Sequence, residues 1–149
     1  MSKFNQQTLN GKDLYFVAVK VFLRRGIELL ILKDYFGDWD LPGGRIRPDE
    51  FNTALFKIVQ RKMREELGVK VRYKLGQPAV FMRHERLENG KIPVRIFALG
   101  YEAKYLGGKI KLSPRHPRMQ WIPLKNFKPG KYFRGGWLKG VVEYLKLKR

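Results

Sequence analysis

The fold of this chain is indicated most clearly by residues 44–69, which read GRIRPDEFNTALFKIVQRKMREELGV. The segment follows a stretch over 35–50 that is rich in glycine and proline, and we expect a loop there. From residue 52 onward, apolar residues recur at steps of three and four, which predicts a helix over 52–67. The apolar stripe consists of Ala54, Leu55, Ile58, Val59, Met63 and Leu67. Gly68, directly after the stripe, predicts the end of the helix.

Two adjacent carboxylates, Glu65 and Glu66, lie near the end of this predicted helix. The glycines at 43–44 let the backbone of the preceding loop approach a ligand closely. A carboxylate pair beside such a loop suits Mg²⁺, which takes few protein carboxylates and keeps water and phosphate oxygens in its shell. The alternative is that both glutamates form ion pairs with Arg61 and Lys62, one helical turn earlier.

The rest of the chain predicts a mixed α/β arrangement. We expect strands over 13–24, 26–34, 69–75, 79–85, 94–105 and 119–124, and a closing helix over 136–147. Tight turns are expected at 25–26 and, at an Asn-Gly pair, within 87–91. Strands interrupted by a central and a terminal helix predict a mixed sheet with helices packed on it. Because no repeat or linker divides the chain, we expect residues 1–149 to form one domain.

The charge balance is strongly basic, with 32 Lys and Arg against 13 Asp and Glu and a net charge of +19. This excess favours anionic partners, either nucleic acid or phosphorylated small molecules. The alternative is that the charge is only spread over a solvated surface. The chain has no cysteine, which excludes a disulfide scaffold, a Cys zinc site and a Cys nucleophile.

We expect a cytoplasmic protein, because a chain without cysteine fits a reducing compartment. No apolar run approaches the ~20 residues of a membrane span, so no membrane partner is expected. The sequence leaves the oligomeric state open, a homodimer included.

The order of residues in 44–69 resembles the box of the Nudix hydrolase superfamily. That box reads Gly, five residues, Glu, seven residues, then Arg-Glu-apolar-x-Glu-Glu-x-Gly-apolar. Gly44 is followed by five residues and Glu50. The second half is matched by Arg61, Met63, Glu65, Glu66, Gly68 and Val69. Segments 39–43 and 121–124 are also similar to Nudix sequences. The resemblance implies a Nudix-type α/β/α sandwich with a mixed central sheet.

Two features of the segment depart from the Nudix pattern. Ten residues, rather than seven, separate Glu50 from Arg61. This lengthens the helix start or the loop before it, and we expect it to shift Glu50 relative to Glu65 and Glu66. The box glutamate after the arginine is Lys62 here. Lys62 lies four residues before Glu66, and a charge pair at ~4 Å is worth ~4 kcal/mol at a dielectric of ~20. We therefore expect weakened or absent metal binding.

The resemblance also implies roles for residues of the box. The metal ligands would be the Gly43 carbonyl, Glu50, Glu65 and Glu66, and the metal Mg²⁺ or Mn²⁺. Arg61 would orient the glutamates by bidentate pairing. Glu65, Glu66 and Arg61 are thus the expected catalytic residues within the box.

The catalytic base is expected outside the box, since some Nudix branches that lose the second box glutamate take a base from another loop. The candidates are His84, Glu85 and Glu102. Of these, His84 has the most suitable intrinsic pKa at neutral pH. The alternative is that His84 is an exposed histidine at a strand end.

Four residues are candidates for substrate binding. Arg45 and Arg47 directly follow the glycine pair and could clamp phosphates, with solvated loop charge as the alternative. Trp39 and Phe81 could stack on a base, with burial in the core as the alternative.

The function expected from the resemblance is Mg²⁺-dependent hydrolysis of a nucleoside diphosphate linked to another group. The substrate would be a nucleotide sugar, a dinucleotide or a nucleoside triphosphate. The alternative is a catalytically impaired Nudix domain that binds RNA or nucleotides through its basic surface. An RNA-end pyrophosphohydrolase would combine both features.

Overall fold

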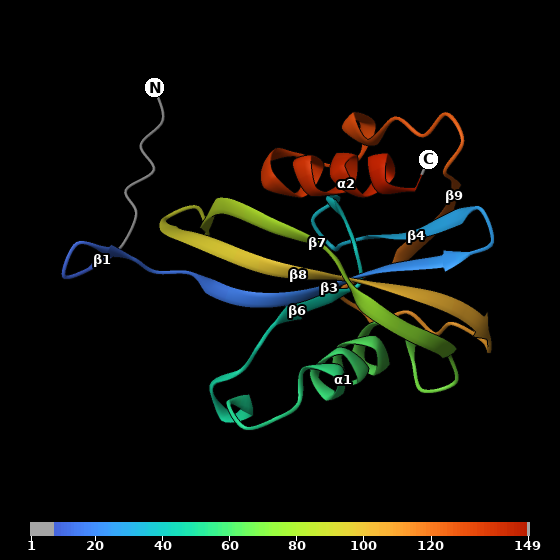
Figure 1. Cartoon of the computed structure of the whole chain (residues 1–149), viewed down its shortest axis with the longest axis horizontal. Helices are drawn as coiled ribbons and strands as arrows, with labels where there is room; N and C mark the ends of the chain where they lie inside the picture. Colours follow the sequence, from blue (N-terminus) through green and yellow to red (C-terminus); the bar gives the residue numbers. More distant parts are fainter. Residues whose placement is uncertain (1–7, 149) are drawn as a thin grey trace.

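A mixed sheet of seven strands forms the centre of the computed structural model, which describes residues 8–148 (Figure 1). Its central strand β3 (Phe16–Arg25) is rich in β-branched and aromatic residues, which favour an extended backbone. β3 pairs antiparallel with β4 (Glu28–Lys33) and parallel with β8 (Ile92–Gly107), and β8 pairs antiparallel with β7 (Arg72–Glu88). The parallel pair in an otherwise antiparallel sheet is what makes the sheet mixed.

Three short strands pair with β4 and β3 and complete the sheet. β5 (Trp39–Asp40) and β9 (Arg118–Pro123) both pair with β4, and β6 (Gly43–Arg45) pairs with β3. A separate hairpin joins β1 (Thr8–Leu9) to β2 (Lys12–Asp13). Its turn is Asn-Gly with both residues at positive φ, the conformation that a two-residue hairpin loop requires.

Two helices cover opposite faces of the sheet (Figure 1). α1 (Leu55–Leu67) lies on one face and α2 (Gly135–Leu147) on the other, and two 3₁₀ turns, η1 (Pro48–Glu50) and η2 (Pro129–Lys131), precede them. The predicted α/β/α sandwich with a mixed sheet is therefore confirmed. Neither helix of the described part of the chain is long and apolar enough to cross a membrane.

Alternation along β3 divides the core into two layers. Val19, Val21 and Leu23 pack with the apolar face of α1. Ala18 and Phe22 point to the other side of the sheet and pack with α2, as the two-residue period of a strand dictates. The Phe22 ring stacks on Tyr144 of α2 at a centroid distance of 4.0 Å.

The structure corrects three of the expected boundaries. The predicted loop over 35–50 contains β5, β6 and η1, because glycine can supply backbone hydrogen bonds to a strand ladder without any side-chain signal. The central helix begins at Leu55 rather than residue 52, since Thr53 N–H closes a turn onto the Glu50 carbonyl at 3.0 Å. The two strands expected over 69–75 and 79–85 are one strand, β7, whose register shifts around Pro78.

Candidate active site

The close approach of β6 to β3 begins at Gly43. Gly43 pairs with Lys20 and has φ 143°. A Cβ at this position would lie 2.1 Å from the Val19 carbonyl oxygen, so only glycine fits without a backbone shift. The Gly43 N–H is turned toward α1 and donates to Glu66 Oε1 at 3.0 Å. The glycine pair thus links the sheet to a carboxylate of the helix.

Glu66 is the most buried carboxylate of residues 44–69, the Nudix segment, with 5% of its surface exposed. Burial raises the pKa of Glu66, although the charge of Lys20, the Gly43 N–H and the charge of Lys62 all act to lower it. A carboxylate with a raised pKa is a better proton acceptor than an ordinary one. Burial thus makes Glu66 a stronger proton acceptor than an exposed glutamate.

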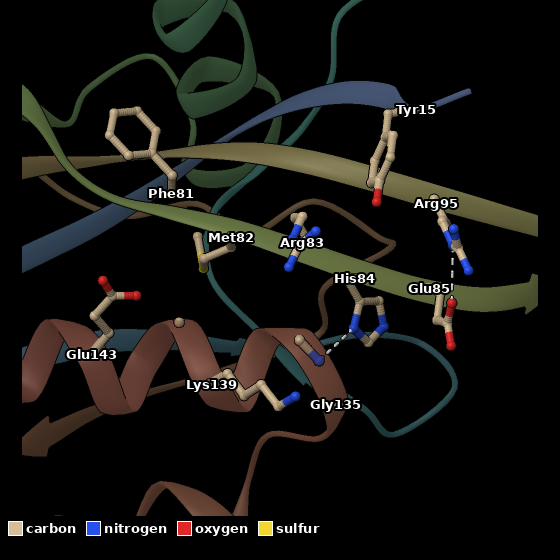
Figure 2. A pocket seen from close by; sticks show the side chains of 12 residues that line it. Tyr15, Phe81, Met82, Arg83, His84, Glu85, Arg95, Gly135, Lys139 and Glu143 are labelled. Carbon is tan, nitrogen blue, oxygen red and sulfur yellow. Dashed lines mark hydrogen bonds and ion pairs between the residues drawn. The ribbon is translucent and has the colours of Figure 1, made fainter. Parts of the chain in front are cut away.

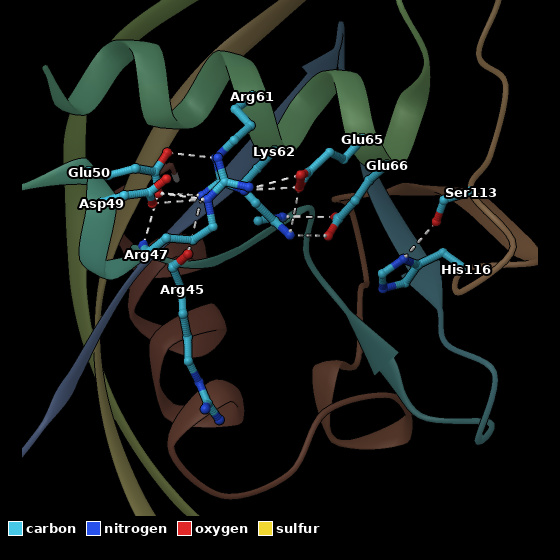
Figure 3. Close-up of polar contacts among 11 residues, drawn as sticks. Arg45, Arg47, Asp49, Glu50, Arg61, Lys62, Glu65, Glu66, Ser113 and His116 are labelled. Atoms are coloured by element: carbon cyan, nitrogen blue, oxygen red, sulfur yellow. Dashed lines mark hydrogen bonds and ion pairs between the residues drawn. The ribbon is translucent and has the colours of Figure 1, made fainter. Parts of the chain in front are cut away.

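Lys62 lies between the two adjacent glutamates (Figure 3). Its Nζ is 3.3 Å from Glu65 Oε1 and 3.5 Å from Glu66 Oε2. Gly44 makes room for this side chain, since a Cβ there would lie 2.7 Å from Lys62 Nζ. The expected pairing of Lys62 with Glu66 is confirmed.

Arg61 joins two of the box glutamates (Figure 3). Its Nε and Nη2 donate to Glu50 at 2.6 and 2.7 Å, and its Nη1 donates to Glu65 at 3.0 Å. The bond with Arg61 lowers the pKa of Glu50. The expected displacement of Glu50 does not separate it from Glu65. Most of the extra length between Glu50 and Arg61 forms a turn outside the core, in which Phe51 is 91% exposed.

A cleft of about 700 Å³ opens beside Glu66. Gly43 and Gly44 line it, together with loops that lie far apart in the sequence. Its cationic lining residues are Lys20, Arg45, Arg86 and Arg115. Lys20 is almost fully buried and donates to Asp40 Oδ2 at 2.8 Å. Asp34 and Asp40 also line the cleft, which therefore combines three carboxylates with four Lys and Arg side chains. This excess of positive charge suits a phosphorylated ligand.

The fold is shared with solved structures of Nudix proteins. The MutT protein of Methanosarcina mazei Go1 is 24% identical with a TM-score of 0.66, and the match covers 90% of this chain and 94% of that one. The NUDIX-family hydrolase of Clostridium perfringens is 16% identical with a TM-score of 0.64, over 91% and 99% of the two chains. The chain has the Nudix fold.

A third neighbour is the ADP-ribose pyrophosphatase of Streptococcus suis, which is 14% identical with a TM-score of 0.59 over 91% of this chain and 93% of that chain. No protein-family model matches the sequence. No curated protein matches it either. At these identities, the similarity establishes the Nudix fold and not the activity.

The carboxylates of the Nudix segment do not fit a resident metal in this arrangement. Within residues 8–148, no three His, Cys, Asp or Glu side chains converge as a metal site requires. The expected ligands Glu50 and Glu65 are bound to Arg61, and the Lys62 ammonium holds the position between Glu65 and Glu66. Mg²⁺ needs near-octahedral oxygen ligands at about 2.0–2.1 Å, and the ammonium would have to leave first. In this structure Glu50, Glu65 and Glu66 form ion pairs, Gly43 lies at the cleft, and their role as metal ligands remains a prediction.

The expected phosphate-binding arginines have different surroundings. Arg45 lines the cleft but is bound through both Nη atoms to Glu88, and its guanidinium lies 4.6 Å from the Phe16 ring. Arg47 is 3.5 Å from Asp49 and 3.7 Å from Glu50, on the η1 side of the segment. Of the two, the structure brings only Arg45 to the cleft.

The two expected stacking residues lie outside the cleft. Trp39 packs edge-on against Tyr132 at a centroid distance of 5.6 Å, as part of the core beneath α2. Phe81 is exposed on β7 and stacks with Phe97 of the neighbouring strand at 6.3 Å. The alternative of core packing therefore holds for Trp39.

His84 lies on β7 and faces the beginning of α2. There it lines a separate cavity of about 570 Å³ (Figure 2). Its Nδ1 accepts a hydrogen bond from the Gly136 N–H at 3.1 Å, and its ring stacks on Trp137 at 4.6 Å. Burial lowers the pKa of His84 to about 4. The structure therefore assigns His84 to helix packing and does not bring it to Glu66.

The other two expected bases also have partners elsewhere. Glu85 binds Arg95 at 3.1 Å. Glu102 accepts hydrogen bonds from Tyr144 and Lys148 at 2.7 and 2.9 Å. Neither carboxylate lines the cleft beside Glu66.

Several lining residues were not singled out from the sequence. Lys20 carries a signal, because it is the one charged residue in the apolar run VAVKVFL over 17–23. A buried lysine needs a partner, which suggests a polar site. Arg86, Arg115 and the pair Tyr35–Phe36 carry no such signal, since strand β7 and two loops bring them together only in the folded chain.

Proposed function

We propose that this protein is a Nudix-type hydrolase that cleaves the diphosphate bond of a nucleotide bound in the cleft beside Glu66. The observation that carries this proposal is the buried Glu66 carboxylate, which the Gly43 N–H holds at a cation-lined cleft in a Nudix fold. The substrate class is a nucleoside diphosphate linked to another group: a nucleotide sugar, a dinucleotide or a nucleoside triphosphate.

The cations of the cleft have a direct part in this chemistry. Arg86 and Arg115 would bind the phosphate oxygens, and Lys20 adds a buried positive charge below them. Fixed cations in a cleft also offset the charge that develops on phosphate oxygens as water attacks phosphorus. This stabilisation is available from the side chains already in place.

Glu66 is the candidate that accepts the proton of the attacking water. It lines the cleft, and burial raises its pKa. Its Oε1 is held by the Gly43 N–H, whereas Oε2 faces Lys62. The new P–O bond forms to water oxygen, the water proton passes to Glu66, and the bridging P–O bond breaks with the leaving phosphate.

A turnover assay on purified protein tests the proposal. The substrates are a nucleotide sugar, a dinucleotide and a nucleoside triphosphate, each with Mg²⁺, with Mn²⁺ and without divalent cation. The metal requirement expected from the sequence remains a prediction that these three conditions decide. Wild type is expected to release phosphorylated products, and Glu66→Gln to lose at least about 100-fold, the lower bound typical of general bases.

The matched control is Glu143→Gln, which removes an exposed carboxylate of α2. Its turnover should equal that of wild type. Failure of wild type to cleave every substrate in all three conditions would refute the hydrolase proposal.

A second function, a catalytically impaired Nudix domain that binds RNA or nucleotides, is favoured by one specific observation. Lys62 already forms ion pairs with both adjacent glutamates, at 3.3 and 3.5 Å. The net charge of +19 would then serve binding rather than chemistry. This function predicts no turnover together with RNA affinity that falls steeply with salt, because bound counterions are released.

A further inference from the structure

Two aromatic side chains stand exposed at the tip of the turn between β4 and β5. Tyr35 is 77% and Phe36 87% exposed, and their rings contact each other edge-on at 5.8 Å. The turn itself is firmly built. Asp34 Oδ1 accepts the Asp38 N–H at 2.8 Å, and the Asp34 N–H donates to the Asp38 carbonyl at 2.8 Å. The rings are therefore presented to solvent by a hydrogen-bonded scaffold.

This turn is attached to the loop on the other side of the cleft. The Tyr35 N–H donates to the Arg115 carbonyl at 2.9 Å. Both aromatic residues line the same cleft as Glu66, together with Arg115 and His116. The exposed rings thus belong to the mouth of the phosphate-binding cleft and are not an isolated apolar spot.

Cations continue past the aromatic pair along β4 and β9. Lys33 ends β4 and is paired in register with Arg118 of β9, and Arg115 lies three residues before Arg118. Like charges directly opposite each other in a sheet are destabilising. Within residues 8–148, none of these three cations forms an ion pair with a carboxylate, although Lys33 lies over the Trp39 ring. An anion bound along this row would offset the repulsion between the cations.

We propose that the Tyr35–Phe36 turn is a stacking platform for single-stranded nucleic acid whose 5′-terminal phosphates enter the cleft. The first base stacks on Tyr35 or Phe36, and the following backbone phosphates lie along Lys33 and Arg118, whereas Arg115 binds the terminal phosphates inside the cleft. Aromatic faces beside a basic groove bind single strands in this manner. The cations beyond the rings distinguish this ligand from a mononucleotide, which has no phosphate to place there. The inference rests on the proposed function in that it uses the same cleft.

Binding of a 5′-triphosphorylated single-stranded RNA of about ten nucleotides, a length within the usual site sizes, tests the platform. Tyr35→Ala with Phe36→Ala should weaken its binding between about 5-fold and 150-fold for one stacked base. Binding of inorganic pyrophosphate should not change, because it has no base. Phe51→Ala is the control, since Phe51 is similarly exposed, at 91%, but does not line the cleft.

The row of cations is tested by the dependence of RNA affinity on salt. Lys33→Ala with Arg118→Ala should reduce the slope of log affinity against log salt by about 1.4, since each phosphate contact of a single strand contributes about 0.7. Lys74→Ala with Lys104→Ala removes the same charge from an opposed pair of exposed lysines in β7 and β8. This control pair lies beside Arg24, at the other end of the sheet, and should leave the slope unchanged.

Three results would overturn the inference. The Tyr35 and Phe36 variant could bind RNA as tightly as wild type, or both cation-pair variants could lower the salt slope equally. The protein could also bind the single strand and its duplex with equal affinity. Turnover decides the proposed function separately. Loss of RNA binding in the aromatic variant supports the platform even when wild type cleaves nothing. Turnover together with unchanged RNA binding in that variant supports the hydrolase and refutes the platform.

Discussion

The ammonium of Lys62 lies 3.5 Å from the carboxylate of Glu66, the one glutamate of the Nudix segment that lines the cleft. The same ammonium is 3.3 Å from Glu65. A side chain of this protein thus supplies a positive charge where two carboxylates would otherwise attract a cation from solution. The ion pairs of Lys62 therefore reduce the negative charge that Glu65 and Glu66 present to a cation.

Replacement of Lys62 by glutamate should create metal affinity. Lys62→Glu removes the competing ammonium and adds a third carboxylate, so Mg²⁺ and Mn²⁺ should bind at least about 10-fold more tightly, for a gain of ~1.4 kcal/mol. Calorimetric titration of metal into each protein measures the effect, and turnover should rise with it. Lys57→Glu, an exposed position of the same helix, is the control for net charge. Equal affinities in wild type and Lys62→Glu would show that Lys62 does not block the site.

The two glycines of β6 should respond differently to alanine. At Gly43 a Cβ meets the Val19 carbonyl oxygen at 2.1 Å, whereas at Gly44 it meets the flexible end of Lys62, with Cε at 2.5 Å. Gly43→Ala should therefore lose more than about 3 kcal/mol of unfolding free energy, and Gly44→Ala less than about 1.5 kcal/mol. Urea unfolding of both variants measures this. Similar losses would argue against the close contact of β6 with β3.

The ion pair of Glu50 with Arg61 should make the protein sensitive to acid. Arg61 lowers the pKa of Glu50 below its ordinary value of 4.5, so the stabilisation is complete above pH 4.5 and is lost as the pH falls below it. Glu50→Gln should cost about 1–3 kcal/mol at pH 7 and much less near pH 3. Urea unfolding at both pH values measures the difference. A cost that is the same at both pH values would contradict the charged pair.

His84 should contribute a second pH dependence, at higher pH. Burial lowers its pKa from 6.5 to about 4, so the unfolded chain takes up a proton between these values that the folded protein does not. The stabilisation is complete above pH 6.5 and is lost as the pH falls toward 4, with about one proton at most taken up on unfolding. His84→Gln should lack this dependence and keep turnover within about 3-fold of wild type, because His84 lies outside the cleft. An NMR titration of His84 near 6.5 would contradict the buried, neutral ring.

Local spacing accounts for what could be predicted about the box. The three- and four-residue steps of the apolar stripe place Ile58 and Met63 on one face of α1, and the four-residue step from Lys62 to Glu66 places those side chains on another. Such relationships depend only on helix geometry. For the same reason, the alternation of β3 and the Asn-Gly turn at 89–90 could be predicted from residues close in sequence.

The sequence by itself therefore determined the Nudix fold and the ion pair of Lys62 with Glu66. The tertiary structure alone decided which residues meet around that pair. Lys20, Arg86 and the Tyr35–Phe36 turn come to one cleft from separate strands and loops, and His84 is withdrawn to α2 by the Gly136 N–H. The physical reason is that spacing along one element fixes its own faces, whereas a cleft depends on how distant elements pack.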